Sequence, residues 1–106
     1  MIAELKKQIE EAWEDRGLLQ YKEYPEAIET VIQKLNRGEI RVAEPILNGW
    51  VINEWIKKAV ILYFPIKEMK EIKVGPFVFH DKMDLKTDYA ATGVRVVPHA
   101  IARYGA

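Results

Sequence analysis

The most constraining feature of this sequence is an apolar segment at residues 54–64, where almost every side chain after Lys58 is hydrophobic. A helix with so little polar surface has to be covered by protein on most of its sides. Asn53 suits the N-cap of such a helix, and Pro65 lacks the amide hydrogen that would continue it. We therefore predict a helix over residues 54–64 at the centre of the fold, with Trp55 buried.

Two amphipathic segments precede this helix. Apolar residues recur every three or four positions over residues 2–13, and Gly17 is a suitable stop. The second segment begins at Pro25, which is tolerated in a first helical turn, and continues to Leu35 before Gly38 ends it. Each segment therefore predicts a helix with one apolar face.

Short strands are predicted on both sides of a tight turn. Ile40 and Val42 alternate with polar neighbours, and Asn48-Gly49 is a strong signal for a type I′ hairpin, in which both central residues have positive φ, so we predict strands at about residues 40–44 and 49–52. Further along, residues 74–79 predict a single extended segment and residues 81–92 a loop. Residues 94–97 predict a strand with Arg95 on one side.

Composition excludes several classes of protein. The chain of 106 residues has sixteen Lys plus Arg and sixteen Asp plus Glu, so no overall field attracts nucleic acid or an anionic membrane. It has no cysteine, which excludes disulfides and thiol chemistry. No signal core or membrane-length apolar run is present, so we expect a cytoplasmic protein. With 49% hydrophobic residues, it should form one globular domain with a modest core.

Five segments together resemble one enzyme family, the tetrahydrodipicolinate N-succinyltransferases of lysine and diaminopimelate biosynthesis. Their order and approximate spacing also match, and the resemblance spans essentially the whole chain. At one position it departs from the family, because Asp84 stands where we expect a proline. The segments are Gly-Glu-Ile-Arg-Val-Ala-Glu (38–44), Asn-Gly-Trp-Val (48–51), Trp-Ile-Lys-Lys-Ala-Val-Ile-Leu (55–62), Phe-His-Asp-Lys (79–82) and Gly-Val-Arg-Val-Val-Pro (93–98).

The resemblance implies a fold and a division into domains. Enzymes of this family have a helical N-terminal domain, a left-handed β-helix of hexapeptide repeats and a small C-terminal region, and they work as trimers. We therefore expect an α+β chain, with about three main helices and a β-hairpin in a helical domain at residues 1–92. Residues 93–106 should begin the β-helix, because residues 101–106 have the shape of one hexapeptide unit.

The resemblance also implies an activity and one site residue. The family transfers a succinyl group from succinyl-CoA to the amino group of ring-opened tetrahydrodipicolinate. Arg95 corresponds to an arginine that contacts this substrate, and a guanidinium can form two parallel hydrogen bonds with a carboxylate. The acidic residue that handles the amine proton and the grooves that hold CoA would follow residue 106. We therefore expect no catalytic residue, cofactor or metal in this chain, and no activity from it alone.

The other chemically interesting residues have simpler explanations. Without the resemblance, Arg95 would be an ordinary strand arginine that faces solvent. Lys57 and Lys58 could bind a carboxylate or a CoA phosphate, but a lysine pair on a core helix is more often its wet edge. Trp50 and Trp55 are better explained as core residues than as platforms for nucleic-acid bases.

The remaining polar residues receive no functional role. His80 with Asp81, Asp84 and Asp88 lacks the spacing of a metal-ligand set and is more simply a solvated loop. Lys82 and His99 have no assigned role, because no motif for an unaided reaction includes them.

Two hypotheses about function remain open. The first is the N-terminal part of a succinyltransferase, which contributes substrate binding and packing of a homotrimer. The second is a complete small α+β binding or interaction protein without catalysis. A reading frame that continues into hexapeptide repeats favours the first, whereas one that ends after residue 106 favours the second. Under either hypothesis, we predict that unpaired edge groups of residues 94–97 favour self-association.

Overall fold

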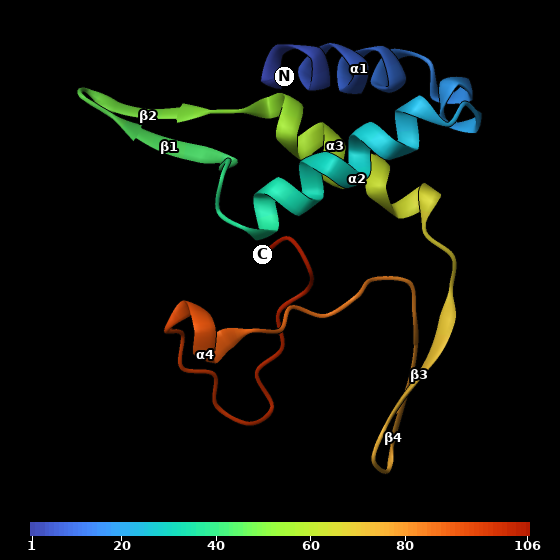
Figure 1. Ribbon diagram of the computed structural model, residues 1–106, viewed down its shortest axis with the longest axis vertical. Helices are drawn as coiled ribbons and strands as arrows, with labels where there is room; N and C mark the ends of the chain where they lie inside the picture. Colours follow the sequence, from blue (N-terminus) through green and yellow to red (C-terminus); the bar gives the residue numbers. More distant parts are fainter.

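Helix α3 (Glu54–Ile66) lies against two other helices, α1 (Ile2–Glu14) and α2 (Glu23–Asn36), in the computed structural model, which describes residues 1–106. Each of the three helices contacts the other two, and together they form the upper part of the molecule in Figure 1. The predicted central helix is confirmed. It runs through Pro65 to residue 66, because a proline in the last turn removes only one hydrogen bond of the helix.

The core consists of apolar side chains that all three helices supply. Eleven of the twelve buried residues form this one cluster, so the rest of the chain has no separate core. Trp55 belongs to it, with 7% of its surface exposed, as predicted. One member, Met83, comes from the segment after the three helices. The other members are Ile9, Ala12, Ile28, Val31, Ile32, Ile56, Ala59, Leu62 and Tyr63.

The ends of the first two helices differ slightly from the prediction. Helix α1 ends at Glu14, and Gly17 lies in a short 3₁₀ helix, η1 (Arg16–Gln20), which the sequence analysis missed. Asp15 precedes η1 and accepts a hydrogen bond from the Gly17 amide at 3.0 Å. Helix α2 begins two residues before Pro25, so Pro25 lies in the first turn, as predicted.

Strands β1 (Ala43–Ile46) and β2 (Gly49–Ile52) form the predicted antiparallel hairpin, but its turn is different. Ile46 pairs with Gly49, so the two loop residues are Leu47 and Asn48. Neither has the positive φ that a type I′ turn requires, and the predicted turn type is therefore wrong. Strand β1 also starts later than predicted, at Ala43, and one further backbone bond, from the Asn53 amide to the Val42 carbonyl at 2.7 Å, lies at the base of the hairpin.

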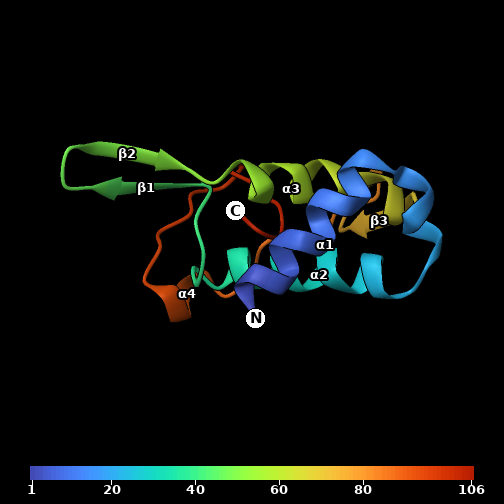
Figure 2. The same cartoon turned by 90° about the horizontal axis from the view of Figure 1, so that it is seen from above.

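The prediction that Trp50 is a core residue is also wrong. Trp50 lies on β2 with 67% of its surface exposed. The hairpin extends away from the helices as an arm (Figure 2), so neither of its faces is covered. A tryptophan on a hairpin becomes buried only where another layer covers its face, and the sequence of the hairpin does not show whether one does.

Strands β3 (Lys70–Val74) and β4 (Phe77–Asp81) form a second antiparallel hairpin where we predicted one extended segment. The chain reverses at Gly75-Pro76, and Gly75 has a φ of +58°, a value that glycine adopts without steric cost. This hairpin also projects from the helices (Figure 1). The α+β class is confirmed, with the helices and two separate two-stranded sheets.

The C-terminal residues do not adopt the predicted strand. Residues 94–97 have no regular secondary structure, so the predicted strand edge is not formed, and self-association of the chain stays a prediction. Residues 93–106 form no coil of a β-helix, and their one ladder contact is an antiparallel bridge between Leu85 and Arg103. Tyr104 instead packs against the helical core. A hexapeptide coil is stabilised by stacking on neighbouring coils, so a single unit lacks the contacts that would hold it.

The arms make the molecule flat and open. Its principal extents are 43 × 40 × 19 Å, and its radius of gyration is 15.7 Å. A compact domain of this length has a radius of gyration of about 13 Å. The hairpins and the C-terminal loop therefore lie largely outside the helical core. None of the helices combines the length and the apolar character needed to cross a membrane.

We predict that Ile56→Ala lowers the free energy of unfolding by about 2–5 kcal/mol, because the Ile56 side chain is fully buried between the helices. Urea denaturation followed by circular dichroism measures this change. Ile61→Ala on the same helix is the matched control, since Ile61 is 46% exposed. Equal losses for the two variants would contradict the proposed orientation of α3.

Candidate functional site

Arg95 lies on an irregular segment at the surface, where its side chain is exposed. It lines a shallow cavity of about 250 Å³ with Tyr89, Ala100 and Ile101. No carboxylate of the chain lies within 4.0 Å of its guanidinium group. Asp81 and Asp84 pair with other cations instead. The cavity is mainly apolar otherwise. The hydrogen-bond donors of Arg95 are therefore accessible to an anionic ligand, and they lie on a loop rather than on the predicted strand; contact with a substrate, which the resemblance implies, stays a prediction.

The backbone before Arg95 turns sharply. The short helix α4 (Tyr89–Thr92) follows Asp88, which has a φ of +61°, and ends at Gly93, with a φ of +74°. The Val94 amide then donates to the Tyr89 carbonyl at 3.0 Å. This turn places Arg95 directly after a closed loop of backbone hydrogen bonds.

The loop of residues 87–101 is closed at its neck by two backbone hydrogen bonds. The Lys86 amide donates to the Ala102 carbonyl at 2.8 Å, and the Tyr104 amide donates to the Asp84 carbonyl at 2.9 Å. The chain segments that lead into and out of the loop, residues 84–86 and 102–104, thus run side by side for a short distance. Arg95 lies in the middle of this loop, far in sequence from the neck.

Two of the three lysines that the sequence analysis considered make contacts with other elements. Lys58 lies 3.5 Å from Glu10 and over the ring of Trp13, so it joins α3 to α1, which confirms its interpretation as the edge of the core helix. Lys82 donates to the carbonyl of Phe64 at 3.0 Å, near the C-terminal end of α3. Lys57 is exposed.

The histidines and aspartates do not gather. His80 lies on β4 opposite Glu71, and His99 is exposed on the loop with a φ of +76°. No group of three His, Asp or Glu side chains is placed to hold a metal ion. Asp81 pairs with Arg103 at 3.4 Å. These side chains are therefore spread over separate elements.

Asp84 forms the shortest ion pair of the chain, 2.8 Å from Lys70, and lies 3.7 Å from Lys67. The hydrogen bond from Lys70, helped by the charge of Lys67, holds the pKa of Asp84 below its ordinary value. Burial raises the pKa of Tyr63, which lies beneath Lys67. Burial alone would lower the pKa of Lys67, but Tyr63, Asp84 and Glu29 raise it overall. This network links β3 and the 81–86 segment to α3.

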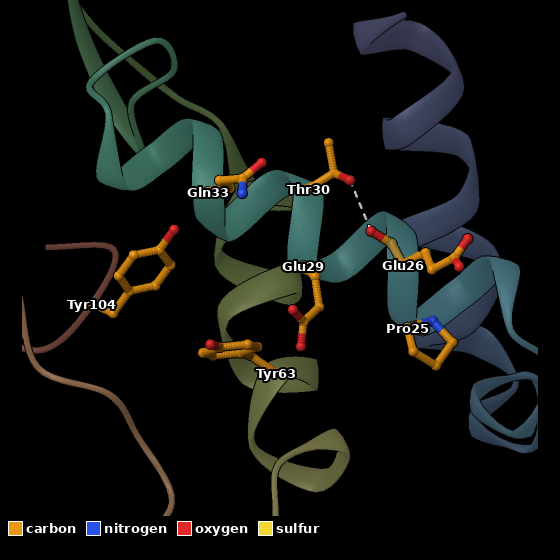
Figure 3. A pocket seen from close by; sticks show the side chains of 7 residues that line it. All are labelled: Pro25, Glu26, Glu29, Thr30, Gln33, Tyr63 and Tyr104. Atoms are coloured by element: carbon orange, nitrogen blue, oxygen red, sulfur yellow. Dashed lines mark hydrogen bonds between the residues drawn. The ribbon is translucent and has the colours of Figure 1, made fainter.

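A larger groove, of about 570 Å³, lies between α2, α3 and the C-terminal segment (Figure 3). The Glu29 carboxylate points toward Tyr63, and Tyr104 faces the same space from the C-terminal segment. Sequence reasoning missed this groove, because its walls come from three distant segments and its α2 residues resemble an ordinary solvated helix face. Its lining residues are Pro25, Glu26, Glu29, Thr30, Gln33, Tyr63 and Tyr104.

The two hollows suit ligands of opposite charge. The groove contains two carboxylates and no cation in its lining, so it repels an anion such as a dicarboxylate. The cavity beside Arg95 contains a guanidinium and no carboxylate, so it attracts one. The candidate site for an anionic substrate is therefore the loop that carries Arg95.

Comparisons with known proteins agree on one family. Residues 4–66 match the family described as tetrahydrodipicolinate N-succinyltransferase N-terminal. The chain is 43% identical to the 2,3,4,5-tetrahydropyridine-2,6-dicarboxylate N-succinyltransferase of Ralstonia pickettii and 45% identical to that of Alkalilimnicola ehrlichii. Each similarity covers 99% of this chain and 42% of the relative. The chain therefore spans less than half the length of these relatives.

We predict that the stabilisation from Asp84 is lost in acid. Its folded-state pKa lies below the ordinary value of 3.8, so its contribution is present above that pH and disappears as the pH falls through the lower folded-state pKa. Asp84→Asn should lower the free energy of unfolding by less than about 1 kcal/mol at pH 7, since the side chain is half exposed.

Urea denaturation at pH 7 and below pH 3.8 measures the Asp84 effect. Asp88→Asn is the control, because Asp88 forms no ion pair and asparagine tolerates its positive φ. A deficit for Asp84→Asn that persists unchanged in acid would contradict the assignment.

Proposed function

Because the chain belongs to the tetrahydrodipicolinate N-succinyltransferase family, as its N-terminal part, we propose that it contributes substrate binding to an acyltransferase. The proposed enzyme transfers succinyl from succinyl-CoA to the amino group of ring-opened tetrahydrodipicolinate, in lysine and diaminopimelate biosynthesis. The relatives' names specify a tetrahydropyridine dicarboxylate and an N-succinyl transfer. The donor and the pathway come from the family resemblance.

One observation supports this proposal in the structure: Arg95 is exposed and has no carboxylate partner within the chain. A dicarboxylate substrate needs cationic, bidentate donors, and a guanidinium supplies two parallel N–H groups in the plane of a carboxylate. Arg95 would hold one substrate carboxylate and orient the amine. It would bind the ground state and the transition state alike, because that carboxylate does not react.

The chemistry itself needs groups that the described residues do not assemble. The amine nitrogen attacks the thioester carbonyl, a C–N bond forms, and the C–S bond breaks to release the CoA thiol. A base must take the amine proton and a donor must protonate the thiolate. We propose that the region following residue 106 in the family supplies the base and the CoA site, and that residues 93–106 lead into its β-helix.

We further propose a homotrimer for the complete enzyme, as the family resemblance implies. The hairpin β1–β2 supports this, because its exposed apolar residues form an uncovered arm. The exposed apolar residues of the arm are Ile46, Leu47, Trp50, Val51 and Ile52. Exposed apolar residues gathered in this way are typical of a surface that another protein element covers.

The test is to join this chain to the downstream region of the Ralstonia pickettii relative, which gives what we call the extended protein. We predict that the extended protein releases CoA thiol from succinyl-CoA in the presence of tetrahydrodipicolinate, whereas this chain alone does not. The release of CoA thiol is measured for both proteins with a chromogenic thiol reagent. Turnover by the 106-residue chain alone would contradict the proposed division of roles, and no turnover by the extended protein would contradict the function itself.

We predict that Arg95→Gln in the extended protein lowers kcat/KM by about 10- to 100-fold, the usual effect of losing hydrogen bonds to a charged group. The loss should lie mainly in KM. Arg41→Gln is the control, since Arg41 is also exposed and forms no ion pair. Equal kinetics for both variants would show that Arg95 does not bind the substrate.

A further inference from the structure

Asn36, the last residue of α2, connects the helical core to both ends of the C-terminal loop. Its side-chain oxygen Oδ1 accepts hydrogen bonds from Lys86 Nζ and from the Gly105 amide, each at 2.9 Å. Its backbone carbonyl accepts a further one from Lys86 Nζ, also at 2.9 Å. Lys86 precedes the loop of residues 87–101, and Gly105 follows it. One side chain therefore contacts the chain on both sides of the loop neck.

These three bonds differ from the other side-chain hydrogen bonds of the protein. They are partly buried, whereas the rest are exposed to solvent. Shielding from water strengthens a hydrogen bond and makes the loss of one partner costly. The lysine ammonium also lies at the C-terminal end of α2, where the helix dipole favours a positive charge. The contacts made by Asn36 should therefore persist in solution.

The close approach of the chain to α2 depends on a glycine. Gly105 has a φ of +99°, and a Cβ at this position would lie 3.2 Å from the Cγ2 of Ile32. A side chain would be strained in this backbone conformation and would also press on the core. Gly105 thus allows its amide to reach Asn36, while the neighbouring Tyr104 packs against the helical core.

The geometry points to Asn36 and Lys86 as a pair of positioning residues that set the placement of Arg95. Asn36 holds the neck at which the loop leaves and returns, and the backbone bonds of Lys86 to Ala102 and of Tyr104 to Asp84 lie directly beside it. The loop has no buried residue of its own, so its placement relative to the core depends on this neck. Neither residue touches the substrate. The expected effect on substrate binding rests on the proposed function, whereas the role of Asn36 and Lys86 at the neck does not.

The first experiment measures amide hydrogen exchange in the 106-residue chain, which needs no activity. Asn36→Ala removes the side-chain acceptor, and we expect exchange at the Lys86 and Tyr104 amides to accelerate about tenfold. Asn36→Asp keeps an acceptor oxygen and should exchange nearly as the unchanged chain does. Lys86→Met should repeat the effect of Asn36→Ala.

Matched controls separate this effect from general destabilisation. Asn48→Ala removes an exposed asparagine in the β1–β2 turn, and Lys7→Met removes an exposed lysine of α1 that forms no ion pair. Neither should alter exchange at the loop neck. If Asn36→Ala also unfolds α2, its core amides will exchange faster too, and Lys86→Met, which leaves the helix sequence intact, then decides the result.

The second experiment measures kinetics in the extended protein. We expect Asn36→Ala to raise KM for the dicarboxylate substrate about tenfold, with kcat changed less than about twofold, and Asn36→Asp to restore KM. A purely structural role would lower the amount of active protein, and hence kcat, without this rise in KM.

The outcomes separate the two proposals. If the extended protein is inactive, the proposed function fails, and the exchange experiment still decides whether Asn36 and Lys86 hold the neck. If the extended protein is active but Asn36→Ala leaves KM unchanged, positioning of Arg95 is overturned. Unchanged exchange at the neck in both Asn36→Ala and Lys86→Met overturns the inference altogether.

Discussion

The burial of α3 between α1 and α2 is the constraint on which the rest of the structure depends. Residues 54–64 carry too little polar surface to face water, and the two amphipathic helices cover them with their apolar faces. Every other element is placed by its attachment to this unit. The hairpin β1–β2 leads into α3, the hairpin β3–β4 leaves it, and the C-terminal segment returns to it through Met83 and Tyr104.

The segment after α3, residues 67–106, is held in a different way from the helices. Apart from Met83 it buries no side chain, and it is joined to the helices by polar contacts: the network around Asp84, the bond from Lys82 to α3 and the bonds to Asn36. Polar contacts of this kind are directional, so they determine where a loop lies, and the exposed ones add little to stability. The candidate site lies in this segment, on a loop whose neck is fixed and whose tip is exposed.

Much of the helical unit could be predicted from the sequence. The spacing of apolar residues located the first two helices and a nearly continuous apolar run the third, and Pro25, Asn53 and Pro65 marked their ends to within a few residues. These signals are local, because a helix forms its hydrogen bonds within one segment. Trp55 was correctly predicted to be buried, since it lies on the helix that the apolar segment places at the centre of the fold.

The strands and the candidate site were predicted less well, because their environment depends on distant residues. Trp50 was expected in the core, yet no layer covers its hairpin, and residues 94–97 were expected as a strand, yet no partner strand pairs with them. The family resemblance, not periodicity, singled out Arg95. The groove between Glu29 and Tyr104 was not predicted at all, because its walls are far apart in the chain.

The sequence by itself determined which segments are helical, which helix is central and which family the chain resembles, because these depend on periodicity and on residue order. Tertiary structure alone decided which apolar residues remain exposed and how the loop that carries Arg95 is attached. The physical reason is that a side chain is buried, or a hydrogen bond formed, only when a second segment supplies the covering surface or the partner atom. Asn36, Lys86 and Gly105 show this most clearly, because they lie 50 and 69 residues apart and meet only in the folded chain.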